Sequence, residues 1–92
     1  MSEVGTRLRA LREGRGVGLR EMARRVRVTA SYLCEVERGH KTPSEAVVRR
    51  LARELRHDPE LLLLWCGVVP PDVIAALRER PGWLERIRAD SG

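Results

Sequence analysis

The 92-residue chain is predicted to be all-α, with a compact domain of five helices followed by a short extension of two helices. Two observations support this prediction. Apolar residues recur at steps of three and four along most of the chain, which is the spacing of one face of an α-helix. Glycine, proline or a capping residue separates one apolar stretch from the next. No stretch is predicted to be a strand, and the chain has no internal repeat.

The first helix is predicted over residues 3–14, because the apolar spacing begins near Glu3 and is interrupted by Gly14 and Gly16. Its apolar face consists of Val4, Leu8 and Leu11. A second, shorter helix is expected over residues 19–26, with Gly18 at the N-cap position. Glycine caps a helix less well than serine or threonine, by a few tenths of a kcal/mol. The apolar face of this second helix consists of Leu19, Met22, Ala23 and Val26.

The third helix, residues 30–38, follows the second after a tight turn. Thr29 is a credible N-cap because its hydroxyl can accept a hydrogen bond from a free amide of the first turn. Gly39 ends the helix, since glycine adopts the left-handed conformation of a C-cap. Leu33, Val36 and the partly exposed Tyr32 form its inner face, and Ala30, Ser31, Cys34 and Glu35 form its outer face. A polar outer face of small residues is suited to the recognition of another molecule.

The fourth and fifth helices are predicted over residues 45–56 and 59–66. Ser44 caps the fourth, and Asp58 caps the fifth, which has Pro59 in its first turn. The fifth helix is apolar almost all round, so we expect it to be buried on more than one side. Two further helices, residues 71–80 and 82–89, are separated by Pro81. The last helix is expected to bury Trp83, Leu84 and Ile87.

The composition suits one small domain. A chain of this length buries about 60–70% of its unfolded surface, enough for one modest core. The hydrophobic fraction of 42% argues against disorder. No apolar run approaches the roughly 20 residues of a membrane span, and the first ten residues have no apolar signal core. We therefore expect a cytoplasmic protein without a membrane partner.

The positive charge is concentrated in the first part of the chain. Residues 1–56 contain 14 basic and 7 acidic residues, a net charge of +7, whereas residues 57–92 contain 4 basic and 6 acidic residues, a net charge of −2. This distribution is typical of a phosphate-binding domain followed by a separate pairing or regulatory segment. Arginine is 17 of the 18 basic residues, so a compositional bias explains part of the excess.

Residues 5–66 resemble the Cro/repressor-type (Xre-like) helix-turn-helix family of DNA-binding transcriptional regulators. The resemblance is carried by LRALREGRGV, LREMARRVRV, TASYLCEVERG and HKTPSEAVVRRLARELRHDPELLL, in this order and spacing. It implies a lambda-repressor-like DNA-binding domain over residues 1–67. Residues 68–92 would be a helical extension for dimerisation or regulation. The family docks the second helix of its motif in the major groove of double-stranded DNA.

The resemblance also implies roles for individual residues. Ala30, Ser31 and Glu35 occupy base-reading positions. Glu35 either accepts a hydrogen bond from a cytosine amine or is a solvated residue or an ion-pair partner of Arg38. Positions that contact phosphates are occupied by Thr29, Tyr32, Arg38, His40 and Lys41. Arg12 and Glu37 match a structural salt bridge between the first and third helices.

The start of the second helix departs from the family pattern. Gly18 and Leu19 stand where the family has a capping residue and a polar phosphate contact. We expect Arg20 or Arg24 to substitute for that side-chain contact.

The resemblance implies a repressor that binds an inverted-repeat operator as a homodimer. The apolar residues near the end of the chain are more than one small monomer easily covers. The expected dimer interface comprises Leu64, Trp65, Val73, Ile74, Leu77, Trp83, Leu84 and Ile87. The alternative is an antitoxin-like or other protein-interaction module whose C-terminal tail binds a partner protein.

Other chemistries have no constellation in this sequence. The cysteines and histidines, Cys34, His40, His57 and Cys66, are too scattered for a zinc site, so no metal is expected. The two cysteines are expected to be reduced thiols. No residues suggest an enzyme active site, and neither a cofactor nor a small-molecule ligand is indicated.

Overall fold

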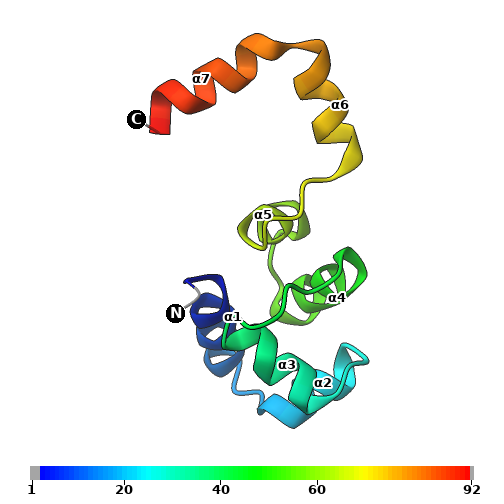
Figure 1. Ribbon diagram of the computed structural model, residues 1–92. Coiled ribbons are helices and arrows are strands. Elements are labelled where there is room, and N and C mark those ends of the chain that lie inside the picture. Colours follow the sequence, from blue (N-terminus) through cyan, green and yellow to red (C-terminus); the bar gives the residue numbers. More distant parts are fainter. Residues whose placement is uncertain (1–2, 92) are drawn as a thin grey trace.

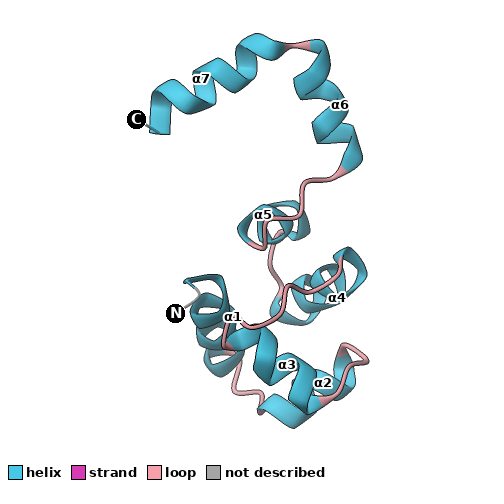
Figure 2. Ribbon diagram, viewed as in Figure 1, coloured by secondary structure: helices cyan, strands magenta, loops and turns pink. Residues whose placement is uncertain are grey.

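The computed structural model describes residues 3–91 and contains, over that range, seven helices and no strand (Figures 1 and 2). The helices are α1 (Glu3–Gly14), α2 (Leu19–Arg25), α3 (Ala30–Glu37), α4 (Glu45–Leu55), α5 (Pro59–Trp65), α6 (Pro71–Glu79) and α7 (Pro81–Ser91). The predicted all-α fold is confirmed, with helix ends displaced by at most two residues. The predicted domain, residues 1–67, and the predicted extension, residues 68–92, include residues 1–2 and 92, which lie outside the described residues.

Side-chain caps define the starts of three helices. Thr29 Oγ1 accepts a hydrogen bond from the Tyr32 amide at 3.0 Å, and Ser44 Oγ accepts one from the Val47 amide at 3.3 Å. Asp58 Oδ1 accepts a hydrogen bond from the Glu60 amide at 2.9 Å. Loss of such a cap typically costs about 1 kcal/mol, so these residues fix where the helices begin. Gly18 precedes α2 without a side-chain cap.

Helices α1 to α5 pack around one apolar core. In Figure 1, α1, α2 and α3 lie at one end of the domain, and α4 and α5 complete the other. The spacing that predicted the helices also predicts which residues face inward, because residues three and four apart share one helical face. The core consists of Leu8, Met22, Ala23, Val26, Leu33, Val36, Val47, Val48, Leu51, Ala52, Leu55, Leu62 and Leu63.

Helix α5 is buried on one side only, so the prediction of burial on more than one side is wrong. Leu62 and Leu63 are fully buried, whereas the side chains of Leu61 and Leu64 are 43% and 51% exposed. The reason is position, because α5 is the last helix of the core and packs against α4. Its outer side has no further helix of the domain to cover it (Figure 1).

Helices α6 and α7 project from the domain and pack on each other, giving a molecule of 44 × 25 × 22 Å (Figure 1). No residue of α6 is buried. Trp83, Leu84 and Ile87 are 43%, 39% and 56% exposed, so the prediction that the last helix buries them is wrong for the single chain. Two short helices in contact do not have enough surface to enclose a core.

No helix of the described residues is long and apolar enough to cross a membrane.

Candidate nucleic-acid interface

Helix α3 is anchored to the domain by its inner face. Leu33 and Val36, one turn apart, are 1% and 3% exposed and belong to the core. Tyr32 is half-buried and packs against the same core. Together with the Thr29 cap, these contacts fix the axis and the rotation of α3. The outer face is therefore presented by a rigid element.

A buried ion pair fixes the C-terminal end of α3. Arg12 Nε donates to Glu37 Oε2 at 2.8 Å, and Arg12 Nη2 donates to Glu37 Oε1 at 3.0 Å. The hydrogen bond to Glu37 is the main reason why the pKa of Arg12 is raised. Arg12 Nη1 also donates to the Val17 carbonyl oxygen at 2.9 Å. One side chain thus connects α1, α3 and the segment before α2, as the family resemblance implies for this pair.

Close backbone packing adds a second constraint on the same end of α3. A β-carbon at Gly5 would lie 2.2 Å from the Glu37 carbonyl oxygen and 2.8 Å from the Val36 carbonyl oxygen. Only glycine allows α1 to approach α3 this closely. Gly5 was not among the residues predicted to be important. The sequence feature that could have identified Gly5 is a glycine within a predicted helix, where glycine is otherwise unfavourable.

The turn between α2 and α3 also depends on residues that the sequence analysis did not identify. Arg27 adopts a left-handed conformation, with φ of 62°, where glycine would be the easier residue. Arg50 on α4 donates from Nε to the Val26 carbonyl oxygen at 2.8 Å. This hydrogen bond satisfies a carbonyl group at the end of α2 and ties the turn to α4.

The three predicted base-reading residues differ in exposure. Ser31 is exposed, whereas Ala30 is half-buried and packs partly against the core. Glu35 is half-buried, and its Oε2 lies 3.1 Å from His40 Nδ1. The expectation of a solvated residue holds in part, since the Glu35 side chain is 37% exposed. The expected ion pair with Arg38 is wrong, because the partner of Glu35 is His40. The separation of five residues is bridged because the chain turns back after α3 at Gly39.

Exposed polar side chains lie beside the outer face of α3. Arg38 and Lys41 are exposed cations, and His40 is exposed next to them. The Lys41 ammonium lies 5.7 Å from the centre of the Tyr32 ring. Beside them, an open hollow of about 310 Å³ between α1, α2 and α3 is lined partly by Arg9 and Arg38. Arg9 is a further exposed cation at this surface that the sequence analysis did not identify. The arrangement can attract phosphates while leaving Ser31 accessible.

The two arginines expected to replace the missing contact on α2 are in different environments. Arg20 is exposed, and its side chain makes no hydrogen bond or ion pair among residues 3–91. Arg24 is hydrogen bonded to Glu21, which also accepts from Arg25 Nε at 3.0 Å. These hydrogen bonds, first that from Arg25, lower the pKa of Glu21. Arg20, in the first turn of α2, is thus the freer of the two cations, whereas Arg24 lies in the last turn.

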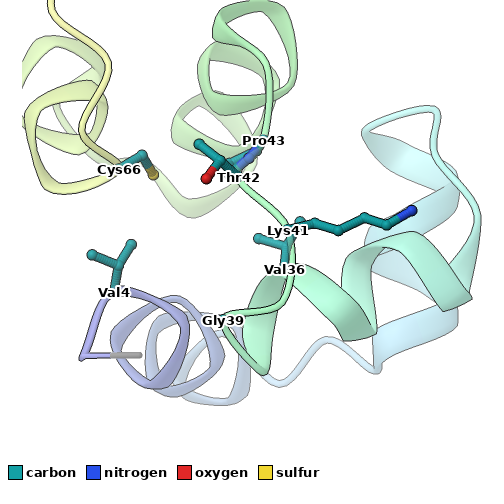
Figure 3. Close-up of a pocket in the computed structure, with 7 residues that line it drawn as sticks. All are labelled: Val4, Val36, Gly39, Lys41, Thr42, Pro43 and Cys66. Carbon is teal, nitrogen blue, oxygen red and sulfur yellow. The ribbon is translucent and has the colours of Figure 1, made fainter. Parts of the chain in front are cut away.

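A small pocket lies beneath the loop that follows α3 (Figure 3). It has a volume of about 100 Å³ and is lined by Val4, Val36, Gly39, Lys41, Thr42, Pro43 and Cys66. Figure 3 shows the Lys41 side chain extending away from Cys66, on the side of α3. Burial raises the pKa of the Cys66 thiol. Ligand pockets are usually about 300–1,000 Å³, so this pocket is too small for a typical ligand.

Cys34 and Cys66 are both free thiols. Among residues 3–91, no group of three or more histidine, cysteine, aspartate or glutamate side chains is placed to hold a metal ion.

The predicted dimer-interface residues fall into three sets. Trp65 packs within the domain, with its ring centroid 4.8 Å from that of His57 and 4.2 Å from the guanidinium carbon of Arg7. Trp65 therefore has partners within its own chain. Ile74 and Leu84 are exposed and are not among the residues that line the groove described next. The remaining residues line one apolar groove between α5, α6 and α7: Leu64, Val73, Leu77, Trp83 and Ile87.

Comparisons with known proteins identify relatives of the whole domain. Residues 3–65 match the model of a helix-turn-helix domain family. An uncharacterised HTH-type transcriptional regulator of Mycobacterium tuberculosis is 35% identical over 75 residues, covering 82% of this chain and 54% of that protein. The transcriptional regulator ClgR of the same organism is 36% identical over 64 residues, covering 70% of this chain and 57% of that protein. The chain spans about half the length of these curated relatives.

Solved structures share the fold. The crystal structure of the clp gene regulator ClgR from Corynebacterium glutamicum superposes with a TM-score of 0.63 and 30% identity, covering 98% of this chain and 90% of that one. A chain of the SinR/SinI protein complex has a TM-score of 0.61 and covers 96% of this chain and 94% of its own. At 22% identity, that second likeness shows the fold alone. The family match and the relatives confirm the resemblance found in the sequence, and the chain belongs to the helix-turn-helix family of transcriptional regulators.

Proposed function

We propose that this protein binds double-stranded DNA sequence-specifically through α3 and represses transcription. One observation carries the proposal. Helix α3 is fixed on its inner side by Leu33, Val36 and the Arg12–Glu37 pair, while on its outer side Ser31 is exposed, the other residues are half-buried, and exposed cations lie beside them. A helix held in this way can enter the major groove as a rigid body. The family membership and the names of the relatives support the same function.

The chemistry of the outer face suits base edges. Ser31 can donate or accept a hydrogen bond, and the methyl group of Ala30 can contact a thymine methyl. Glu35 can accept from a cytosine amine through Oε1, because its hydrogen bond to His40 uses Oε2. His40 also reduces the repulsion between this carboxylate and nearby phosphates whenever the imidazole is protonated.

The surrounding residues suit the phosphate backbone. Arg20, Arg38 and Lys41 are exposed cations that can contact phosphates without reading the sequence. Thr29 and Tyr32 add hydroxyl groups, while Arg24 must first release Glu21. Binding through such contacts releases counterions, so affinity should fall steeply as the salt concentration rises.

Repression follows if the protein binds as a homodimer at an inverted repeat that overlaps a promoter. In this proposal residues 1–67 bind DNA and residues 68–92 pair the two copies. Two recognition helices about 34 Å apart would occupy successive major grooves on one side of the duplex. The apolar groove of the extension supports this arrangement, because a single chain leaves it uncovered.

The alternative is a protein-interaction module whose extension binds a different protein, with DNA binding secondary or lost. The uncovered groove is the observation that favours it. Deletion of residues 68–92 separates the two functions. A dimeric regulator should lose DNA affinity, whereas an interaction module should lose its co-purifying protein and keep whatever DNA binding it has.

Selection of bound duplexes from a random DNA pool tests the main proposal. Ser31→Ala should change the preferred base, by roughly 1–3 kcal/mol for a good contact. Lys41→Ala should instead weaken all duplexes alike and reduce the salt slope by about 1. Arg78→Ala, which removes an exposed cation from α6, is the matched control and should change neither. The proposal fails if no duplex binds in dilute buffer, or if Ser31→Ala and Lys41→Ala have the same effect.

A further inference from the structure

The turn at the C-terminal end of α3 fixes His40 against Glu35. Gly39 adopts a left-handed conformation, with φ of 81°, and its amide donates to the Val36 carbonyl oxygen at 3.1 Å. The His40 amide donates to the Glu35 carbonyl oxygen at 2.8 Å. These two hydrogen bonds form a Schellman motif, in which the residue after the left-handed glycine lies against the last turn of the helix. The backbone therefore sets the position of His40 relative to α3.

The side chains of the same two residues are also paired. His40 Nδ1 lies 3.1 Å from Glu35 Oε2, and the two side chains are 58% and 37% exposed. A Schellman motif often has an apolar contact between these two positions. Here an imidazole and a carboxylate replace it at the outer surface of α3. Because an apolar contact would also support the turn, the polar pair indicates a role beyond folding.

The pair leaves one atom of each side chain available to a ligand. Glu35 Oε1 and His40 Nε2 have no hydrogen-bond partner within residues 3–91. Glu35 lies one turn along α3 from the exposed Ser31, so the two share one face. Oε1 can accept a hydrogen bond from a base amine, and a protonated Nε2 can donate one to a phosphate oxygen. The two free atoms thus suit a base edge and the backbone beside it.

The two cations that flank His40 in the sequence do not pair with Glu35. The Lys41 ammonium lies 5.7 Å from the centre of the Tyr32 ring instead. Arg38 is exposed, and its side chain makes no ion pair within the described part of the chain. His40 is therefore the partner that the protein itself supplies for this carboxylate.

The helices packed against α3 add charges that stay constant near neutral pH. In the hollow beside α3, α1 contributes Arg9 and Arg12, and α2 contributes the uncharged Leu19. Arg12 is paired with Glu37. Arginine, lysine and ion-paired glutamate side chains keep their charge over the range in which imidazole titrates. Among the groups at this end of α3, the imidazole of His40 is the one whose type changes charge between pH 5 and 8.

We propose that His40 and Glu35 read a base as one unit, and that DNA binding favours the protonated imidazole. His40 holds the Glu35 carboxylate toward a base amine. With a neutral imidazole the pair keeps a negative charge that phosphates repel, whereas a protonated imidazole cancels that charge and offers Nε2–H to a phosphate. DNA binding then takes up a proton, and by linkage the affinity rises as pH falls. This inference rests on the proposed function and adds a pH dependence to the same site.

The pH profile of DNA affinity tests the proton uptake. For the full-length protein and a duplex selected from a random pool, the dissociation constant should rise about 5-fold or more from about pH 5.5 to about pH 8. His40→Asn keeps a donor near the position of Nδ1 but cannot be protonated. Its dissociation constant should change little with pH and stay near the wild-type value at high pH. His57→Gln is the matched control, because it removes the second of the two histidines, which packs on Trp65, and should keep the wild-type profile.

The base preference tests the positioning by His40. Glu35→Ala identifies the base pair that Glu35 reads, where the wild type should prefer one base by about 5-fold or more. His40→Ala should lose the preference at the same base pair, and the double variant should lose no more than either single variant. His40→Asn should retain the preference. The measurement is the ratio of dissociation constants for two duplexes that differ only at that base pair, since phosphate contacts are common to both and cancel.

The inference is overturned if Glu35→Ala changes no base preference or if His40→Ala keeps the wild-type preference. It is also overturned if the wild-type affinity is independent of pH or if His40→Asn has the wild-type pH profile. Urea unfolding of each variant shows that the domain remains folded. All four outcomes leave the proposed function standing, because a duplex is still bound. A wild type that binds no duplex at any pH overturns the proposed function and this inference with it.

Discussion

The five-helix domain and the two-helix extension have similar local sequence signals but different degrees of burial. Helices α5 and α6 both begin with proline, and both carry apolar residues at helical spacing. Leu62 and Leu63 of α5 are fully buried, whereas α6 has no buried residue. The apolar pattern therefore specifies that a helix forms and which of its faces packs against other apolar surface. Whether that partner lies in the same chain depends on the number of neighbouring helices.

The buried ion pair should provide the largest effect within the domain. Arg12→Met leaves Glu37 enclosed without a counter-charge, and should lower the free energy of unfolding by about 3–5 kcal/mol. Urea denaturation measures this loss. Arg9→Met is the matched control on the same helix, because the Arg9–Glu13 pair is exposed and contributes less than about 1 kcal/mol. Equal losses for the two variants would show that the buried Arg12–Glu37 pair stabilises the domain no more than the exposed Arg9–Glu13 pair does.

Two leucine truncations compare the domain and the extension directly. Leu62→Ala creates a cavity in the core and should cost about 2–5 kcal/mol of unfolding free energy. Leu84→Ala, in the extension, should cost less than about 0.5 kcal/mol, because its side chain is already 39% exposed. Thermal or urea unfolding at low protein concentration checks both. A cost at Leu84 similar to that at Leu62 would mean that α7 packs on the domain in solution.

Relief of backbone strain in the turn should give a smaller effect of opposite sign. Arg27→Gly should stabilise the domain by about 0.5–1 kcal/mol, because glycine accepts the left-handed conformation more easily than arginine. The gain is limited by the greater freedom of glycine in the unfolded chain. Arg27→Ala is the control, since it removes the charge but keeps the β-carbon, and should give no such gain. If alanine stabilises as much as glycine, charge rather than strain is responsible.

Cys66, between the domain and the extension, should give the smallest and most local effect. Burial raises its pKa, so the folded protein keeps the thiol proton to higher pH than the unfolded chain does. Its contribution to stability is therefore present below the ordinary thiol pKa and is lost as pH rises through the folded value. In a Cys34→Ser background, iodoacetamide should react with native protein at a higher midpoint pH than with protein in guanidinium. If the native and denatured proteins react with the same midpoint pH, the Cys66 thiol is not buried in the folded protein.

Local features of the fold could be predicted from sequence because each depends on a few neighbouring residues. Thr29, Ser44 and Asp58 form the predicted caps, and the apolar spacing of α1 to α3 identified their inner faces. Contacts between distant residues were predicted less well. The partner of Glu35 is His40 rather than Arg38, because the path of the chain after Gly39 decides which side chain returns to α3.

The remaining features required knowledge of the backbone. The need for glycine at position 5 becomes visible only when α1 is placed against the end of α3. The left-handed Arg27 and the hydrogen bond from Arg50 depend in the same way on how the turn between α2 and α3 is placed. Trp65 was assigned to an interface because tryptophan is common there, but Arg7 and His57 supply its contacts within the chain.

The consecutive prolines Pro70 and Pro71 give the extension a mechanical property. Each pyrrolidine ring fixes one backbone torsion, and Pro70 is itself buried, so the chain leaves the domain in a direction set largely by covalent geometry. A stiff connection of this kind limits the orientations that residues 71–91 can take relative to the domain. The extension therefore loses less conformational entropy when it binds a partner.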